Sequence, residues 1–408
     1  MRGERREGAY LLEDESLAEK AEKDSDTIQA TRKLIQDLFG DKTISQMAAA
    51  DFTRFNDTVR LLPSSHGKSC YDRERTCHEI IRRAEEKADR ERRKAEIQIR
   101  KEELDGDDAE ALREKARLKR IAPKTFQRHQ GNLNTAMNHA VAQGVISHNP
   151  FQQFVVGEKL IEELRQARPD TSRKLWHSEL QDMLATEKWN SDKTLIDDPI
   201  YWLPLIAVLH GLRSEEILQL KPENIRNYKG IFYFDIERGT GQSAKSNNAR
   251  RLVPIHSQLI ELGFLELVAR QRRLKKSRIF AKVNRSKTKK ATFTANFTKN
   301  FKYYRVTHDV YDERMDFHAL RTTCNTAMVT SSTPDTARRY LMGHKNPDVG
   351  IINYLPEGFP LETLQRYIEQ EQLDLSMITT NFAKSNSETK GPYLVVENGV
   401  EVLGRRAS

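Results

Sequence analysis

Hydrophobic residues recur at intervals of three and four along most of the chain, which predicts a mainly helical protein. One such stripe runs from Phe52 to Leu62 and stops at Pro63, a residue that ends helices. A second runs through residues 122–150. In the second half, the nearly continuous apolar run PIYWLPLIAVL, which begins at Pro199, predicts a helix that is buried on all sides.

Two segments predict strands instead. Residues 231–237 read IFYFDIE and residues 251–255 read RLVPI, both rich in aromatic or β-branched side chains. Between them lies the turn-rich sequence GTGQSAKSNNAR. We therefore expect one antiparallel hairpin with a long connecting loop, set among helices.

Residues 71–120 are dominated by Arg, Lys, Glu and Ala and contain few large apolar residues. The sequence DGDD at residues 105–108 divides the segment into two charged helices. This segment suits either an arm that faces DNA or a partner, or a solvated helical hairpin. Because its positive and negative charges nearly cancel, we favour the solvated hairpin.

These patterns predict two folded domains joined by a charged, proline-interrupted connection. The expected division is a flexible N-terminal arm (1–25), a helical domain with the charged insertion at 71–120 (26–150), a linker (151–173), a second domain (174–374) and a C-terminal tail (375–408).

The chain is basic, with 68 Lys and Arg against 59 Asp and Glu, a net charge of +9 and a pI of about 9.2. This balance favours a polyanionic partner. No stretch approaches the ~18 apolar residues that a membrane span requires. The N-terminus also lacks the apolar core of a signal peptide, so we expect a cytoplasmic protein that contacts no membrane.

The three cysteines, Cys70, Cys77 and Cys324, are few and odd in number, which suits a reducing compartment. Cys70 and Cys77 lie near His66 and His78, but the spacing matches no familiar zinc-ligand pattern. We expect no metal site, and we interpret Cys70 and Cys77 as surface thiols.

Candidate chemistry gathers between residues 316 and 358. His318 and Arg321 lie three apart and therefore project from one face of a predicted helix. His344 follows an expected helix end, and Tyr354 follows a short apolar run. Imidazoles, a guanidinium and a phenol can attack a phosphodiester without a metal if further positive charge is supplied. Arg213, at the rim of the apolar run that begins at Pro199, is a source of that charge.

The order of these residues resembles that of the tyrosine recombinases, the integrases of phages and mobile elements. The motif consists of Arg213 with Glu216, then Lys245, His318-x-x-Arg321, His344 and Tyr354. The resemblance covers roughly residues 125–372, whereas the charged insertion has no counterpart. It implies a helical core-type DNA-binding domain followed by an α-rich catalytic domain with a small antiparallel β-sheet.

The resemblance also implies a role for each residue. Arg213 and Arg321 would bind the scissile phosphate, and Glu216 would hold Arg213 in place. Tyr354 would be the nucleophile, with His318 as its base and His344 as an assisting group. Lys245, on the loop between the two predicted strands, would protonate the leaving 5′ oxygen. Each residue alone suits packing or a surface ion pair; the set in this order favours catalysis.

The implied reaction forms a 3′-phosphotyrosyl bond and needs no cofactor. It implies double-stranded DNA with specific core sites as the substrate and a homotetramer on synapsed DNA. Integration or excision of a mobile element is the expected role. The rival interpretations are a type IB topoisomerase-like relaxing enzyme and a catalytically inactive DNA-binding regulator of the same fold.

The helix predicted within residues 122–150 has a polar face opposite its apolar stripe. Its members could contact phosphates and base edges or could form an ordinary hydrated surface. With the resemblance in view we favour DNA contact for these residues, which are Lys124, Arg128, His129, Asn132 and Thr135.

Overall fold

The structure is a computed structural model that describes residues 28–67, 72, 74–167, 173–236, 251–287, 291–344, 358–385, 393–397 and 400–404. The chain divides into two compact units, Met1–Asp170 and Thr171–Ser408. The division falls inside residues 151–173, the segment predicted as a linker.

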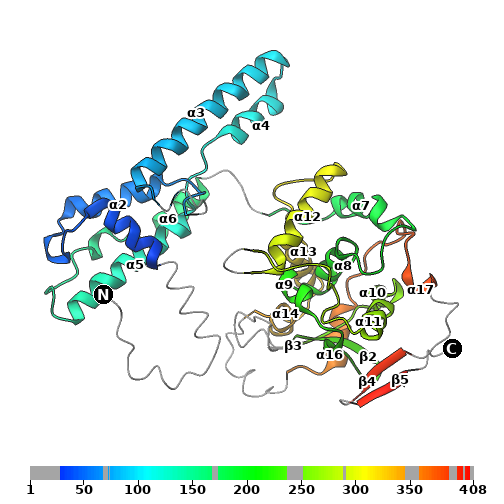
Figure 1. The fold of residues 1–408 in the computed structure, drawn as a ribbon. Coiled ribbons are helices and arrows are strands. Elements are labelled where there is room, and N and C mark those ends of the chain that lie inside the picture. Colours follow the sequence, from blue (N-terminus) through cyan, green and yellow to red (C-terminus); the bar gives the residue numbers. More distant parts are fainter. Residues whose placement is uncertain are drawn as a thin grey trace. The chain divides into compact units, whose positions relative to one another are not determined.

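The first unit is built of helices (Figure 1). They pack around a small hydrophobic core that contains several phenylalanines. Phe151 is fully buried there, with its ring 5.4 Å from that of Phe52 and 6.0 Å from that of Phe55. The predicted linker therefore begins within this core. The surrounding elements are a helix over residues 28–39, η2 (Ile44–Gln46), α2 (Ala49–Leu61), α5 (Pro123–Ala142), η4 (Gln152–Phe154) and α6 (Glu158–Gln166).

The charged insertion forms a helical hairpin of α3 (Cys77–Lys101) and α4 (Gly106–Ala116). α3 begins at Thr76, whose hydroxyl accepts from the Glu79 N–H while the Glu79 carboxylate accepts from the Thr76 N–H. This reciprocal capping satisfies backbone donors that the first helical turn leaves unpaired. The two helices lie side by side and project from the rest of the unit (Figure 1).

The second unit contains a small sheet, in which β1 (Ile225–Tyr228), β2 (Ile231–Ile236) and β3 (Arg251–Pro254) are antiparallel. The predicted pairing of residues 231–237 with 251–255 is confirmed, because Ile236 lies opposite Arg251 and Tyr233 lies opposite Pro254. The predicted fold class is likewise confirmed: the protein is mainly helical with a small antiparallel sheet.

A hairpin near the C-terminus extends this sheet. β4 (Tyr393–Glu397) and β5 (Val400–Gly404) pair with each other, and β4 lies beside β1 in parallel through Asn227 and Glu397. The strand order is β3-β2-β1-β4-β5. Residues 375–408, predicted as a tail, thus contribute two strands. The sequence signal was the alternation in YLVVENGVEVL around an Asn-Gly pair, which is typical of hairpins.

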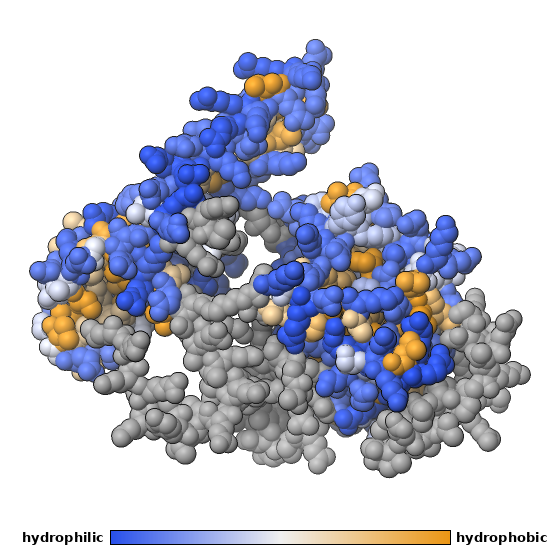
Figure 2. All heavy atoms as spheres, viewed as in Figure 1, coloured by the Kyte–Doolittle hydropathy of each residue, from blue (hydrophilic) through white to orange (hydrophobic). Residues whose placement is uncertain are grey.

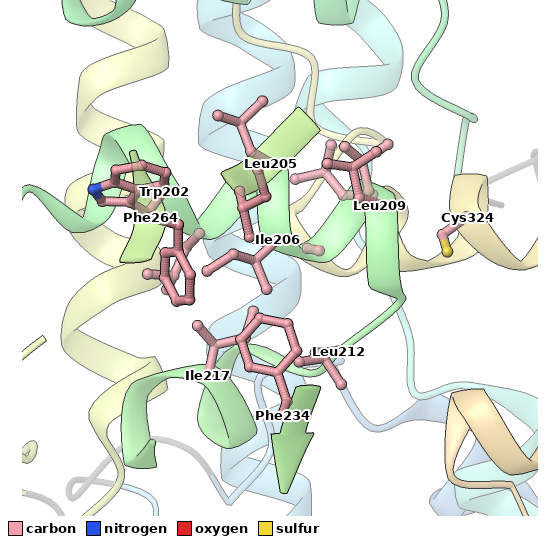
Figure 3. Close-up of a cluster of buried hydrophobic side chains, with 14 of the residues drawn as sticks. Trp202, Leu205, Ile206, Leu209, Leu212, Ile217, Phe234, Phe264 and Cys324 are labelled. Carbon is pink, nitrogen blue, oxygen red and sulfur yellow. The ribbon is translucent and has the colours of Figure 1, made fainter. Parts of the chain in front are cut away.

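Helix α8 (Pro199–His210) forms the centre of the second unit, and every residue from Ile200 to His210 is buried. Leu205, Ile206 and Leu209 pack among residues of neighbouring elements (Figure 3). No described helix is both long and apolar enough to cross a membrane. The other helices are α7 (Ser178–Leu184), η5 (Glu187–Trp189), α9 (Ser214–Gln219), η6 (Pro222–Asn224), α10 (Ser257–Glu261), α11 (Phe264–Arg273), α12 (Phe293–Thr307), α13 (Phe317–Thr330), α14 (Asp335–Met342), α16 (Leu361–Ile368) and α17 (Phe382–Ser385).

The two cysteines within the described residues, Cys77 and Cys324, are both buried thiols. Cys77 opens α3 on the face that packs against the first unit's core, with none of its surface exposed, so the predicted surface thiol is wrong there. Cys70 lies outside the described residues. In the described part of the chain, no three His, Cys, Asp or Glu side chains form a group that could hold a metal ion.

Because each unit has its own core, a cavity made in one should leave the other intact. We expect Phe55→Ala to destabilise the first unit by about 3–5 kcal/mol through the space it opens. Calorimetry of the full chain should show one unfolding transition lowered and the other unchanged, and Phe264→Ala should do the reverse. Transitions that move together in both variants would show that the units unfold as one.

Candidate active site

Arg213 lies where α8 gives way to α9. Gly211 ends α8 in the left-handed conformation, at φ +65°, and Arg213 is the N-cap of α9. A Cβ at Gly211 would collide with the sulfur of Met342, so glycine is required by both backbone and packing. Arg213 donates from its side chain to Glu216 Oε1 at 2.7 Å and from its backbone N–H to Glu216 Oε2 at 2.9 Å. This tight turn aims a partly exposed guanidinium outward from the rim of the core.

Glu216 is shared by a second arginine that the sequence analysis assigned no role. Arg251, at the start of β3, donates to Glu216 Oε2 at 3.0 Å and Oε1 at 3.3 Å, and from Nε to the Leu341 carbonyl at 2.8 Å. Its side chain has no exposed surface. Burial alone would raise the pKa of Glu216, but Arg251 and Arg213 together lower it to about 2. Glu216 is therefore a permanent anion between two guanidinium groups.

Arg321 projects from α13 into the same region and is only 3% exposed. Its guanidinium donates to the carbonyl oxygen of Gly211, which follows α8, and to that of Met342, which ends α14. A further hydrogen bond of 3.0 Å joins it to Nε2 of His344. Burial and the neighbouring Arg213 lower the pKa of Arg321 to about 9, which still leaves it cationic at neutral pH.

His344 follows Gly343, the left-handed residue that ends α14. Arg321 can only donate, so Nε2 of His344 is the acceptor in their hydrogen bond and the neutral imidazole carries its proton on Nδ1. Burial and the nearby Arg321 and Arg213 lower the pKa of His344 to about 4. The ring is therefore a neutral donor through Nδ1 at physiological pH.

His318 lies one turn before Arg321 on α13 and is exposed. Asp316 caps this helix by accepting from the Ala319 N–H at 2.8 Å, and it also accepts from Arg173 at 2.8 Å. Partial burial, Arg173 and Arg321 lower the pKa of His318 below its ordinary value of 6.5. His318 is therefore mainly unprotonated at neutral pH, the state that a general base requires.

Lys245 and Tyr354 lie outside the described residues, but the chain that flanks each is fixed. The segment with Lys245 leaves β2 at Ile236 and returns at Arg251, the residue bound to Glu216. The segment with Tyr354 leaves at His344 and returns at Gly358. Both segments are thus attached at one end to a residue of the arginine cluster.

Gly358, where the described chain resumes after Tyr354, packs closely against Tyr340. Gly358 has φ +85°, and a Cβ there would lie 2.7 Å from the hydroxyl of Tyr340. Tyr340, on α14, accepts a hydrogen bond of 3.2 Å from the Leu252 N–H. The chain after Tyr354 therefore re-enters the fold against both α14 and β3.

The structure brings together Arg213, Glu216, Arg321 and His344, as the sequence predicted, and adds Arg251. The signal for Arg251 was weak: an arginine before the apolar triplet Leu-Val-Pro, in a sequence already rich in arginine. A charged residue that opens a strand is ordinarily exposed. Only the packing of α9 and α14 around β3 encloses this one.

The polar face predicted for α5 is only partly a surface. Lys124, Arg128 and Thr135 are exposed, and Asn132 is partly exposed and donates to Thr31 at 2.8 Å. His129 is 3% exposed, and its Nδ1 lies 2.9 Å from the Thr31 hydroxyl. The predicted DNA contact by His129 is therefore wrong, because its side chain is enclosed between α5 and the helix over residues 28–39.

Comparison with known proteins gives a family match within the second unit. Residues 174–356 match the model of the phage integrase family. No curated protein matches the chain. Similar solved structures include the integrase of transposon Tn1549 in complex with circular intermediate DNA, at 15% identity and a TM-score of 0.38, covering 84% of this chain and 99% of that one.

Two phage proteins are also similar. A lambda integrase dimer bound to a COC′ core site has 15% identity and a TM-score of 0.35, covering 62% of this chain and 76% of that one. The integrase of mycobacterium phage Brujita has 16% identity and a TM-score of 0.31, covering 63% of this chain and 78% of that one. These structures are distant from this chain both in sequence and in superposition.

Removal of Arg251 should leave the Glu216 carboxylate buried with one cation too few. We expect Arg251→Met to lower the free energy of unfolding at pH 7 by about 3–5 kcal/mol. A carboxylate whose pKa is lowered by folding contributes stability above its ordinary pKa and loses that contribution as the pH falls through its folded value. For Glu216 this window runs from 4.5 down to about 2.

The pKa of Glu216 should be higher in the variant, so the difference between the two proteins should shrink by about 1–2 kcal/mol between pH 7 and pH 3.5. Urea unfolding of both proteins at pH 7 and at pH 3.5 measures this difference in stability. Arg273→Met, at an exposed position on α11, is the matched control. A loss that is the same at both pH values would mean that Arg251 acts by packing rather than by charge.

Proposed function

We propose that this chain is a site-specific DNA recombinase of the phage integrase (tyrosine recombinase) family, whose model matches residues 174–356. It cuts and rejoins strands through a 3′-phosphotyrosyl intermediate. The observation that carries this proposal is the preorganised cluster of Arg213, Arg321 and His344, held around the single carboxylate of Glu216.

The cluster suits a phosphodiester because it holds more positive charge than its own anion neutralises. Arg213 and Arg321 come from different helices, α9 and α13, so they can bind the two nonbridging oxygens of one phosphate from separate directions. Their hydrogen bonds to backbone carbonyls and Glu216 fix them before the substrate arrives. Such preorganised charge stabilises the additional negative charge of the transition state.

The proton transfers follow from the protonation states at the site. Tyr354 attacks phosphorus through its phenolic oxygen, and the phenol proton passes to His318, which is neutral because its pKa is lowered. His344, through its Nδ1–H, donates to a nonbridging oxygen. The bond from phosphorus to the 5′ oxygen breaks, and Lys245 gives that oxygen a proton.

The intermediate keeps the energy of the broken bond, so the reaction reverses without an energy source. A 5′ hydroxyl from the partner strand attacks the phosphotyrosine, and the phenol is released. The substrate is double-stranded DNA with specific core sites, bound by a homotetramer in the cytoplasm. Integration or excision of a mobile element is the proposed role, with Lys124, Arg128, Asn132 and Thr135 on α5 contacting DNA.

Replacement of the phenol oxygen tests the nucleophile. Tyr354→Phe should bind DNA within about twofold of the native chain yet form no covalent adduct, since only the attacking oxygen is lost. The substrate is a nicked duplex that carries candidate core sites, sought as inverted repeats in the DNA beside the gene. Denaturing gels resolve the covalent adduct. Tyr303→Phe removes the same atom from an exposed tyrosine and should keep the adduct.

The same assay separates the rival functions. A native chain that binds the repeats and yields no adduct would be a DNA-binding regulator. Adducts on plasmids without the repeats, together with relaxation and no joining of two labelled DNAs, would identify a topoisomerase-like enzyme. An adduct that persists in Tyr354→Phe would place the nucleophile at another residue.

Sulfur substitution at the 5′-bridging position tests Lys245. Lys245→Ala should be slow on ordinary DNA, and the bridging sulfur should restore most of its rate, because a thiolate leaves without a proton. Arg213→Ala should be slower by at least ~10² and should gain much less, since its defect lies at the nonbridging oxygens. Single-turnover cleavage rates give the comparison.

Equal rescue of both variants, or no rescue of Lys245→Ala, would move the general acid elsewhere. Lys282 and Lys287, in the segment after the helix that follows β3, are the next residues to consider. Lys282 donates to Asp197 at 2.8 Å, so Lys287 would be the first to examine.

A further inference from the structure

The outer face of α3 is a cationic stripe. Cys77–Lys101 contains nine Lys or Arg and six Asp or Glu, a modest excess that the acidic residues of the following segment cancel. The cations nevertheless concentrate on one exposed face, which also carries Glu86. Residues four and three apart share a helical face, and this spacing joins five exposed cations: Arg83, Lys87, Arg90, Lys94 and Lys101.

The opposite side of α3 packs on α4 and retains much of the negative charge. Glu96 accepts from Arg113 at 2.9 Å across the hairpin, and Glu85 accepts from Arg120 at 2.7 Å. In the part of the chain that the structure describes, Arg83, Lys87 and Arg90 form no comparable ion pair. Lys94, also on this face, pairs with Glu91 at 3.0 Å. The near-zero net charge of the insertion therefore conceals an exposed face with an excess of cations.

The seam between the helices keeps this arrangement in place. Ala88 and Ala95, on the inner side of α3, are buried, as is Ala109 of α4. Small residues at these positions let the two helices approach closely. This packing fixes which face of α3 is turned toward solvent. The stripe from Arg83 to Lys101 is then about 27 Å long at 1.5 Å per residue.

We propose that this stripe binds the phosphate backbone of duplex DNA beyond the stretch contacted by α5. The hairpin projects from the helices of the first unit, so it can reach DNA that flanks the core site (Figure 1). The inference rests on the proposed function only in requiring that the protein binds DNA. It assigns the insertion to affinity and positioning rather than to sequence recognition.

A protein partner fits this surface less well. The hairpin is mainly hydrophilic in the face shown by Figure 2, with a few small hydrophobic patches. Ile97, 65% exposed, is the one large apolar residue on the stripe. Protein interfaces are depleted in lysine and enriched in aromatic residues. Rows of cations spaced along a rigid rod are typical of contacts with a polyanion.

The acidic end of the hairpin limits the contact. Between Lys101 and Ala111 every charged residue is acidic: Glu102, Glu103, Asp105, Asp107, Asp108 and Glu110. These carboxylates repel phosphates. Binding is therefore confined to the stripe, and the end of the hairpin must point away from the duplex.

Charge removal tests the stripe. The variant with Arg83→Gln, Lys87→Gln, Arg90→Gln and Lys94→Gln should bind a 40-bp duplex of random sequence at least about tenfold more weakly at moderate salt. Its slope of log affinity against log salt should fall by about 2–4, since each lost phosphate contact removes ~0.9. Circular dichroism should show an unchanged helical content.

The matched control removes four cations from the other sides of the same hairpin. The variant with Arg92→Gln, Arg113→Gln, Lys115→Gln and Arg117→Gln has the same net charge and should bind within about twofold of the native chain. Equal weakening of both variants would show a general charge effect and overturn the proposal. Failure of the native chain to bind DNA would overturn the proposed function as well, so the two failures are distinct.

Crosslinking identifies what the stripe touches. A photo-crosslinking amino acid in place of Ile97 keeps every cation, and it should attach to labelled DNA. The same residue in place of Ala111, exposed on α4, should not. An adduct from position 97 to a second copy of the chain, with none to DNA, would make the stripe a protein interface and overturn the proposal.

Discussion

The arginine cluster of the second unit depends on one buried carboxylate. Glu216 accepts from Arg213 and Arg251 and lies close enough to Arg321 to affect its pKa. Burying several guanidinium groups together is costly without an anion among them. A single carboxylate cannot balance all three, and backbone carbonyls at Gly211, Leu341, Met342 and Gly343 accept the remaining hydrogen bonds. The cluster keeps a net positive charge, which suits an incoming phosphate.

Two helix ends make this arrangement possible. α8 and α14 both stop at a glycine in the left-handed conformation, and each ending leaves carbonyl groups that need donors. The arginines supply those donors. A Cβ at Gly343 would lie 2.6 Å from Nη1 of Arg251, so the backbone approaches the guanidinium as closely as glycine permits. The backbone carbonyls left free where these two helices end are thus the groups that hold the arginines in place.

The first unit uses charge in a different way. The cations of the α3 stripe are exposed and are arranged along a rod rather than around a point. Surface charges of this kind contribute little to stability but much to association with polyanions. One chain therefore carries a buried cationic cluster with few, fixed acceptors and an exposed cationic stripe that solvent screens. The buried cluster suits a single phosphate, whereas the exposed stripe suits the phosphate backbone of a long nucleic acid.

The sequence by itself determined the elements with strong periodic signals. The apolar run of α8, the aromatic strand β2 with its partner β3, and the order of Arg213, Glu216, Arg321 and His344 were all readable, because local patterns and a family motif carry them. Three features were decided only by tertiary structure. Arg251 is buried, His129 is enclosed against Thr31, and α4 covers one face of α3. Each depends on which element packs against a given face, and that is set by contacts between residues distant in sequence, which the periodicity of a single helix or strand does not encode.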